Sequence, residues 1–286
     1  MRSLLDASGD SIEVILVDQS DDDATKRAVA PWSGDPRFRY LASQTHGKGT
    51  ALNEGLHASR GTVLVCTDDD VIVPPHWAAD MARVLESQPS AGVLYCRVAA
   101  VPHDKSAGYV PSYDPPATRL VTSIGELRNG TGLGAAMGLR RDFVEQLGGF
   151  DDFFGPGGRF PSADEFDLSI RALLSGWHVY ETTELSVVHD GFRTFAQGKE
   201  HARRDWVALG ACFAKPLRAR RLSAAIIPLW FFPRRALFPP LVDLLMLRRP
   251  RGIGRISAFV KGFADGLKTA VDPATLRFKA SSGSRP

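Results

Sequence analysis

The chain has 286 residues, 44% of them hydrophobic, so it can bury a sizeable core and is not an intrinsically disordered protein. Its three cysteines, Cys66, Cys96 and Cys212, are odd in number and far apart, which argues against a disulfide framework or a structural zinc site and fits a reducing cytoplasm. The net charge of +3 divides unevenly, since residues 1–200 carry −10 and residues 201–286 carry +13. We therefore expect an acidic body that suits a metal ion with an anionic ligand, and a basic tail that suits phosphate-bearing surfaces.

The first two-thirds of the chain alternates β-rich runs with helical patterns, which is typical of an α/β fold with a mainly parallel sheet flanked by helices. Residues 101–119 are rich in Pro and Gly and predict a long loop. Strands are expected at residues 12–18, 38–42, 62–67, 92–98, 132–140, 177–181 and 185–189, and helices at residues 47–59, 76–88, 141–149 and 163–176.

The C-terminal part is helical, basic and apolar. A helix is expected from residue 192 to about Lys215, and the strongly apolar sequence that follows is interrupted by arginine pairs and prolines. Its longest uncharged run, residues 222–233, is shorter than the roughly 20 residues that cross a bilayer. We divide the chain into a body, residues 1–200, and a basic amphipathic tail, residues 201–286.

Two interpretations of this tail stay open. Basic residues beside Trp and Phe are the composition of an anchor that lies on a membrane surface. A pair of helices packed on the body, with a solvated basic face, would show the same pattern. Because the arginines alternate with Leu, Ile, Phe and Pro, an anionic membrane is the better partner and no nucleic-acid binding is expected.

Acidic residues stand where two of the expected strands end. Asp18 closes the first strand, and Asp68, Asp69 and Asp70 follow the strand at residues 62–67. Ligands of an open parallel sheet bind at the carboxyl ends of its strands, and alternate carboxylates can point into one crevice. A hard divalent cation would offset their repulsion and hold a diphosphate on its far side. Alone, such a triplet is more often an acidic turn.

The order of several motifs is more specific than any one of them. VDQSDDD, GKGTALNEGLHASRG, VLVCTDDDVIVPPHW, GGFDDFFGPG, DEFDLSIRALLSGW and VVHDGFR follow one another along the chain. Together they resemble the family 2 glycosyltransferases of GT-A fold over roughly residues 4–195. The resemblance implies a Rossmann-like sheet and inverting transfer of a sugar from a nucleoside-diphosphate donor to an acceptor hydroxyl, with Mg²⁺ or Mn²⁺. The acceptor would be a glycan or lipid-linked, and the protein would act in the cytoplasm or at the inner face of the cell membrane.

The resemblance also implies residues that bind the metal ion. Asp68 and Asp70 match the family's DxD motif, with Asp70 as the direct metal ligand and Asp68 nearer the ribose or a metal-bound water. Asp69 is a substitute for either. His189, at the end of the last strand, matches a histidine that reaches the metal, although a lone histidine is more often structural.

On the donor side, Asp18 and Gln19 fall where the family contacts the base of the nucleotide. Many members have a second acid where this chain has Gln19, so base preference stays open. Lys48 matches a basic position near the donor, and an exposed lysine before a helix explains it equally well.

A second chemical centre is expected at the start of the helix that begins near Asp164. The family's pattern of Glu-Asp, one residue, Asp-Leu, two residues and Arg occurs here with the first two acids reversed. By position Glu165 is the general base, and Asp164 is the alternative. A structural account also exists, because Ser162 and Glu165 have the spacing of a capping box, and Asp167 and Arg171 that of an i,i+4 ion pair.

The N-terminal end departs from the family's pattern. Members normally begin with an apolar strand and a Pro-Thr-x-Asn turn, whereas residues 1–14 resemble the end of the helix that follows. We therefore expect a GT-A-like body without its first strand and a start codon further upstream. An inactive, membrane-associated pseudo-glycosyltransferase that binds a nucleotide or a partner protein is one alternative. An aspartate-dependent phosphatase is another, and Ile72 argues against it because that class has Thr or Val there.

Overall fold

The computed structural model describes residues 1–5 and 12–280. The strands are β1 (Val14–Asp18), β2 (Phe38–Ala42), β3 (Val63–Thr67), β4 (Val71–Ile72), β5 (Ala91–Ala100), β6 (Gly108–Tyr109), β7 (Arg119–Val121), β8 (Ala136–Arg140), β9 (His178–His189) and β10 (Arg193–Thr194). The α-helices are α1 (Arg2–Leu5), α2 (Ala24–Val29), α3 (Lys48–Ala58), α4 (Trp77–Glu86), α5 (Arg141–Leu147), α6 (Asp164–Leu174), α7 (Phe195–Arg218), α8 (Ile226–Phe232), α9 (Phe238–Leu245) and α10 (Ile253–Lys268). Short helical turns are η1 (Ala30–Trp32), η2 (Ile124–Asn129), η3 (Leu222–Ala225) and the π-helical η4 (Pro233–Leu237).

The central sheet has six strands in the order β3-β8-β5-β9-β4, with β7 also paired to β9. Only β5 and β9 pair in parallel within it, and the separate β1–β2 pair is parallel as well. The α/β fold is confirmed, but the expected mainly parallel sheet is corrected to a mixed one. The sheet is mixed because β8 lies antiparallel between β3 and β5. It thereby separates β3 from β5, two strands that local patterns would pair with each other. The two strands expected at residues 177–189 form one long strand, β9.

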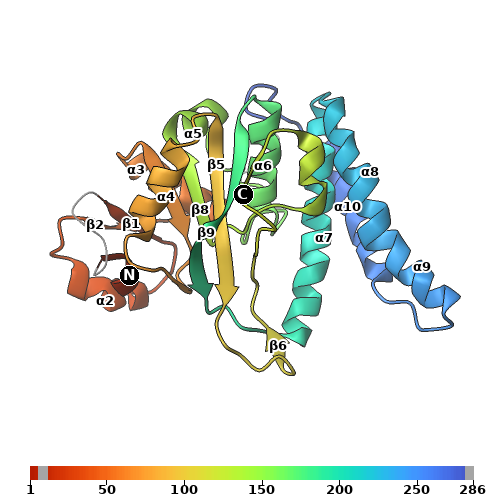
Figure 1. The fold of residues 1–286 in the computed structure, drawn as a ribbon, viewed down its shortest axis with the longest axis horizontal. Helices are drawn as coiled ribbons and strands as arrows, with labels where there is room; N and C mark the ends of the chain where they lie inside the picture. Colours follow the sequence, from red (N-terminus) through yellow and green to blue (C-terminus); the bar gives the residue numbers. More distant parts are fainter. Residues whose placement is uncertain (6–11, 281–286) are drawn as a thin grey trace.

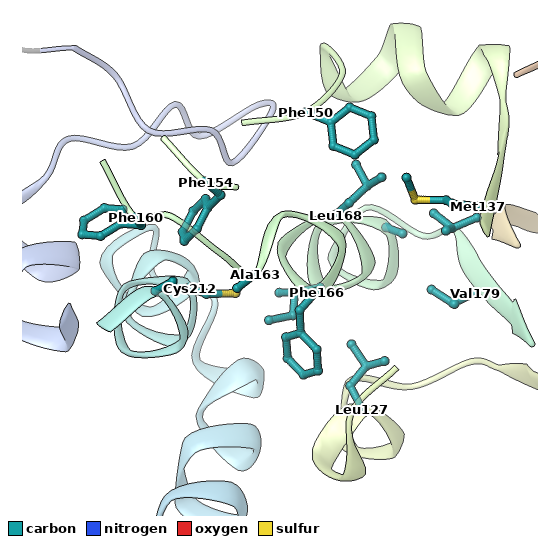
Figure 2. Packing of buried hydrophobic residues seen from close by; sticks show 14 of the residues in the cluster. Leu127, Met137, Phe150, Phe154, Phe160, Ala163, Phe166, Leu168, Val179 and Cys212 are labelled. Carbon is teal, nitrogen blue, oxygen red and sulfur yellow. The ribbon is translucent and has the colours of Figure 1, made fainter. Parts of the chain in front are cut away.

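Strand β5 divides the core because its side chains alternate between the two faces of the sheet. Leu94 and Cys96 face α4, in a cluster with its residues Trp77, Met81 and Leu85. Val93 and Tyr95 belong to the larger cluster on the other face, which α6 fills. Figure 2 shows α6 between strand residues such as Met137 and Val179 and the α7 residue Cys212. Helix α6 is therefore held firmly against the middle of the sheet.

The described part of the basic tail, residues 201–280, packs on the body and forms no separate core. The expected boundary at residue 200 falls inside α7, and the larger cluster includes Phe213, Phe259 and Phe278 together with sheet residues. Helices α7 and α10 run side by side, and α8 and α9 lie beyond them at the edge of the molecule (Figure 1). Residue 200 thus marks a change of charge within one continuous core. Among the helices described, none has the length and apolarity that crossing a bilayer requires.

Candidate functional site

Strand pairing brings Asp70 and His189 together. Val71 of β4 pairs with His189 at the end of β9, so Asp70, one residue before β4, lies beside the imidazole. The distance from His189 Nε2 to Asp70 Oδ2 is 3.3 Å; the histidine side chain is 5% exposed and the aspartate side chain 44%. His189 Nδ1 lies 2.7 Å from the carbonyl oxygen of Pro111, which can only accept a hydrogen bond. In a neutral ring Nδ1 would therefore carry the hydrogen, and the Nε2 lone pair would face a carboxylate oxygen of Asp70.

Two electron-pair donors that face each other fit a cation between or beside them. A histidine that donates its other N–H to a backbone carbonyl is the usual arrangement of a metal ligand. Gly191 keeps the space open, because a Cβ there would lie 2.6 Å from His189 Nε2 and 2.8 Å from Asp70 Oδ2. Within residues 1–5 and 12–280, no three His, Cys, Asp or Glu side chains gather closely enough to hold a metal. The chain thus offers two ligands, which suits Mg²⁺ or Mn²⁺ sites completed by water and substrate phosphates.

Asp68 faces Lys48 instead of His189. Lys48 Nζ lies 2.5 Å from Asp68 Oδ1, and both side chains are about a quarter exposed. Burial alone would lower the Lys48 pKa, but Asp68, Asp164 and Glu165 outweigh it and raise that pKa. Lys48 is therefore a fixed cation between Asp68 and the acids of α6. Of the three predicted metal ligands, only Asp70 and His189 lie against each other.

The start of α6 places Asp164 and Glu165 at the site. The predicted capping box of Ser162 and Glu165 is wrong: the helix begins at Asp164, its N-cap is Ala163 in a left-handed conformation (φ 66°), and no side chain caps it. A non-glycine residue adopts such a backbone only when its surroundings enforce it. The Glu165 carbonyl accepts hydrogen bonds from Tyr95 Oη and Ser169 Oγ, both at 2.9 Å. The Glu165 side chain is thus not engaged in capping.

Burial, which is the largest cause, the neighbouring Asp164 carboxylate and a hydrogen bond between the two acids together raise the pKa of the Glu165 carboxyl to about 8, while Lys48 opposes the shift. Near neutral pH the Glu165 carboxyl therefore holds its proton. A carboxyl group that titrates this close to neutrality is suited to general acid–base catalysis. Both acids that the sequence proposed for that role thus lie together.

Two of the three remaining predicted donor residues, Asp18 and Gln19, lie at the end of β1. Asp18 is 7% exposed; one of its oxygens accepts hydrogen bonds from Ser20 at 2.6 and 3.0 Å, and the other accepts from Tyr40 Oη at 2.7 Å. These hydrogen bonds lower the Asp18 pKa against the effect of burial, which is the largest single influence and raises it. Gln19 donates to the carbonyl of Gly47, directly before Lys48. Asp69 is exposed and forms no ion pair among the described residues.

The family described as glycosyl transferase family 2 matches residues 1–148, slightly more than half of the chain. The chain belongs to this family. The predicted family is therefore confirmed, and the predicted site residues Asp18, Lys48 and Asp68 all lie inside the matched part.

Two relatives are similar in sequence to about a third of this family 2 chain. It is 36% identical over 93 residues to the succinoglycan biosynthesis protein ExoO of Rhizobium meliloti (strain 1021), covering 32% of this chain and 26% of that protein. It is 27% identical over 101 residues to EpsH of Bacillus subtilis (strain 168), covering 35% of this chain and 29% of that one. The aligned segment thus spans less than a third of either relative.

Two solved structures share the fold. Residues 1–349 of S. aureus TarS, in complex with UDP-GlcNAc, superpose with a TM-score of 0.60 at 14% identity, over 89% of this chain and 73% of that one. The mannosyltransferase PcManGT from Pyrobaculum calidifontis, in complex with GDP-Man and Mn²⁺, gives 0.53 at 18% identity, over 90% and 78%. These likenesses confirm the fold class.

Two acids of the family 2 motifs have structural partners that the sequence did not reveal. Lys215 Nζ lies 2.6 Å from Asp151 Oδ2 and 2.5 Å from Asp167 Oδ1, and all three side chains are at most 2% exposed. Arg171 donates to backbone carbonyls, including that of Gly149 at 2.8 Å, and its predicted pairing with Asp167 is a longer contact of 3.8 Å. In the sequence, this network was indicated only by Lys215, a single lysine within an apolar stretch of α7.

A glycine-rich loop covers the start of α3. The amide of Lys48 donates to the carbonyl of Pro156 at 2.8 Å. Gly157 has a φ of 82°, and a Cβ there would lie 2.6 Å from the Gly47 Cα. The two backbones can approach this closely only because both residues are glycines. The loop therefore fixes the backbone that carries Lys48.

Proposed function

We propose that this family 2 chain transfers a sugar from a nucleoside-diphosphate donor to an acceptor hydroxyl with inversion of the anomeric configuration. The observation that carries the proposal is the position of Lys48, whose cation pairs with Asp68 and interacts with Asp164 and Glu165. It joins the two centres that the sequence predicted separately. A cation is needed where a diphosphate departs, and a carboxyl group is needed where a hydroxyl attacks.

Glu165 is the proposed general base. It takes the proton of the acceptor hydroxyl as that oxygen attacks the anomeric carbon, in a transition state with oxocarbenium character. The bond between the anomeric carbon and the diphosphate oxygen breaks on the opposite side, so the configuration inverts. Asp164 holds the hydrogen bond to Glu165 and is the alternative base. Lys48 offsets negative charge that develops on the leaving diphosphate.

Asp70 and His189 are the proposed protein ligands of Mg²⁺ or Mn²⁺. When bound, the cation would supply electrostatic stabilisation to the diphosphate. Asp68 holds Lys48 in place, Asp69 stays the substitute ligand, and Asp18 and Gln19 are the proposed contacts to the nucleotide base. PcManGT with GDP-Man and Mn²⁺ and TarS with UDP-GlcNAc support donors and a metal of this kind.

We also propose a glycan or lipid-linked acceptor and action in the cytoplasm, at the inner face of the cell membrane. The succinoglycan biosynthesis protein ExoO supports a role in glycan assembly. The +13 charge of residues 201–286 supports a position near anionic lipid.

The test is release of nucleoside diphosphate from a panel of UDP- and GDP-sugars with Mn²⁺ and simple glycoside acceptors. We expect release by the wild type and a loss of about 10²–10⁴-fold in Glu165→Gln, as for removal of a general base. Glu145→Gln, a change of the same kind at an exposed position of α5, should keep the wild-type rate. Nucleotide binding without turnover would indicate a pseudoenzyme, and phosphate release from a generic ester would indicate a phosphatase.

A further inference from the structure

Exposed apolar side chains gather on one segment of the tail, residues 222–247, which we call the arm. It runs from η3 through α8, η4 and α9 to Leu247 and forms one edge of the molecule (Figure 1). Of the 17 large hydrophobic residues that are exposed in the described chain, 11 lie in the arm: Leu222, Ile226, Leu229, Leu237, Phe238, Leu241, Val242, Leu244, Leu245, Met246 and Leu247. Contiguous exposed apolar surface of this kind marks an interaction site.

The inner face of α8 is fixed against the body, so the outer face of this helix cannot turn inward. Phe231 packs against Trp206 with ring centres 5.7 Å apart, and Phe232 stacks on Phe259 at 4.5 Å. Ile227 is fully buried. A helix on the surface of a globular protein usually turns polar residues to the solvent, whereas α8 is apolar on both faces.

The arm is also positively charged, with almost no acids to offset it. Its own arginines and those flanking it are exposed and form no ion pair among the described residues: Arg220, Arg221, Arg234, Arg235, Arg248 and Arg249. The one acid of the arm, Asp243, is buried and pairs with Arg251 at 2.8 Å. An anionic partner would therefore meet an uncompensated positive surface.

Two of these arginines, Arg234 and Arg235, and Arg128 of η2 converge on a cleft of about 300 Å³ where the arm meets η2. Its lining residues are Arg128, Trp230, Phe231, Arg234 and Arg235. The guanidinium carbons of Arg234 and Arg128 lie 3.6 and 4.8 Å from the centre of the Trp230 ring. No carboxylate pairs with any of the three arginines in the described chain. Guanidinium groups held in this way are suited to binding a phosphate.

We propose that the outer face of the arm lies on an anionic lipid bilayer, with the Trp230 cleft holding the phosphate of a lipid headgroup. Apolar side chains beside arginines and a tryptophan are the composition of a helix that lies in the membrane interface. Arg234 and Arg235, in the middle of the arm, keep it along the surface instead of across the bilayer. A second copy of the chain is the weaker candidate, because a two-fold interface would bring the unpaired arginines of both copies together.

The test is cosedimentation of the full chain with vesicles of phosphatidylcholine alone and of phosphatidylcholine mixed with phosphatidylglycerol. We expect binding to the mixed vesicles only, weakened by salt. Arg234→Gln/Arg235→Gln should weaken binding about 30-fold, since each arginine near such a surface contributes about 1 kcal/mol. Lys26→Gln/Arg27→Gln removes the same charge from α2, at the opposite end of the molecule (Figure 1), and should leave binding within about twofold of the wild type.

Two further variants separate the cleft from the arm. Arg248→Gln/Arg249→Gln removes two arginines outside the cleft, so we expect it to weaken vesicle binding less than Arg234→Gln/Arg235→Gln does. Equal weakening by the two variants would contradict phosphate binding in the cleft. Leu245→Glu/Leu247→Glu should abolish binding, with an unchanged melting temperature because both side chains are exposed. Equal binding to both kinds of vesicle would refute an anionic surface. The proposal would also be refuted if the wild type formed a dimer that does not bind vesicles, and if this dimer dissociated in the variant Leu245→Glu/Leu247→Glu. Vesicle binding needs no sugar nucleotide, so its failure is distinct from failure of the proposed activity.

Discussion

Replacing Lys215 with Met tests whether the tail and the body fold as one unit. The substitution keeps most of the side-chain volume but leaves the carboxylates of Asp151 and Asp167 without the cation that lies 2.6 and 2.5 Å away. Both acids are at most 2% exposed, so water cannot replace it. Removing one partner of a buried ion pair costs about 3–5 kcal/mol. Domains have a total stability of about 5–15 kcal/mol, so we expect a large loss.

Urea unfolding followed by circular dichroism measures this loss. The wild type should unfold in one transition, because Lys215 connects α7 to α6, and Asp151 also accepts a hydrogen bond from the Phe278 amide of the C-terminal segment at 2.7 Å. Lys199→Met, at an exposed position of the same helix, should change stability by less than about 0.5 kcal/mol. A loss below about 1 kcal/mol in Lys215→Met, or a separate transition of the tail, would refute the single core.

Three other predictions concern the site. Activity should rise with pH through about 8 as Glu165 loses its proton, and Asp164→Asn should move this rise to lower pH by removing a neighbouring negative charge; abolished activity would instead make Asp164 the base. Because folding raises the Glu165 pKa, the protonated carboxyl stabilises the folded state fully below about pH 4.5, and this stabilisation is lost as the pH rises towards 8. Urea unfolding at a series of pH values should show this loss in the wild type and not in Glu165→Gln. Gly191→Ala should abolish activity in a folded protein, since its Cβ would lie 2.6 Å from His189 Nε2, and wild-type rates would contradict the role of that space.

Local patterns in the sequence predict local structure well. Helix α4 was expected at residues 76–88 and spans Trp77–Glu86, because Trp77, Met81 and Leu85 mark one buried face at helical spacing. Strand β3 was expected from a short apolar run at residues 62–67 and spans Val63–Thr67. The residues of the site were predicted from the order of their motifs, and the pairing of β4 with β9 brings Asp70 and His189 together.

The features that the sequence did not reveal depend on contacts between distant segments. Nothing in residues 136–140 indicates that β8 enters between β3 and β5. The capping box failed because the backbone of Ala163 turns left-handed, which no pattern in its neighbours indicates. The partner of Asp167 is Lys215, 48 residues away, and no local rule joins them.

Release of nucleoside diphosphate by Asp70→Asn, compared with the wild type, tests the central claim most directly. The wild type, supplied with Mn²⁺ and a panel of sugar nucleotides, should release product, and Asp70→Asn should lose at least about 100-fold, in line with removal of a charged group that supports the departing diphosphate. Asp142→Asn, an exposed change of the same kind on α5, should match the wild type. Equal release by the wild type and Asp70→Asn would contradict a transfer site built on Asp70 and His189.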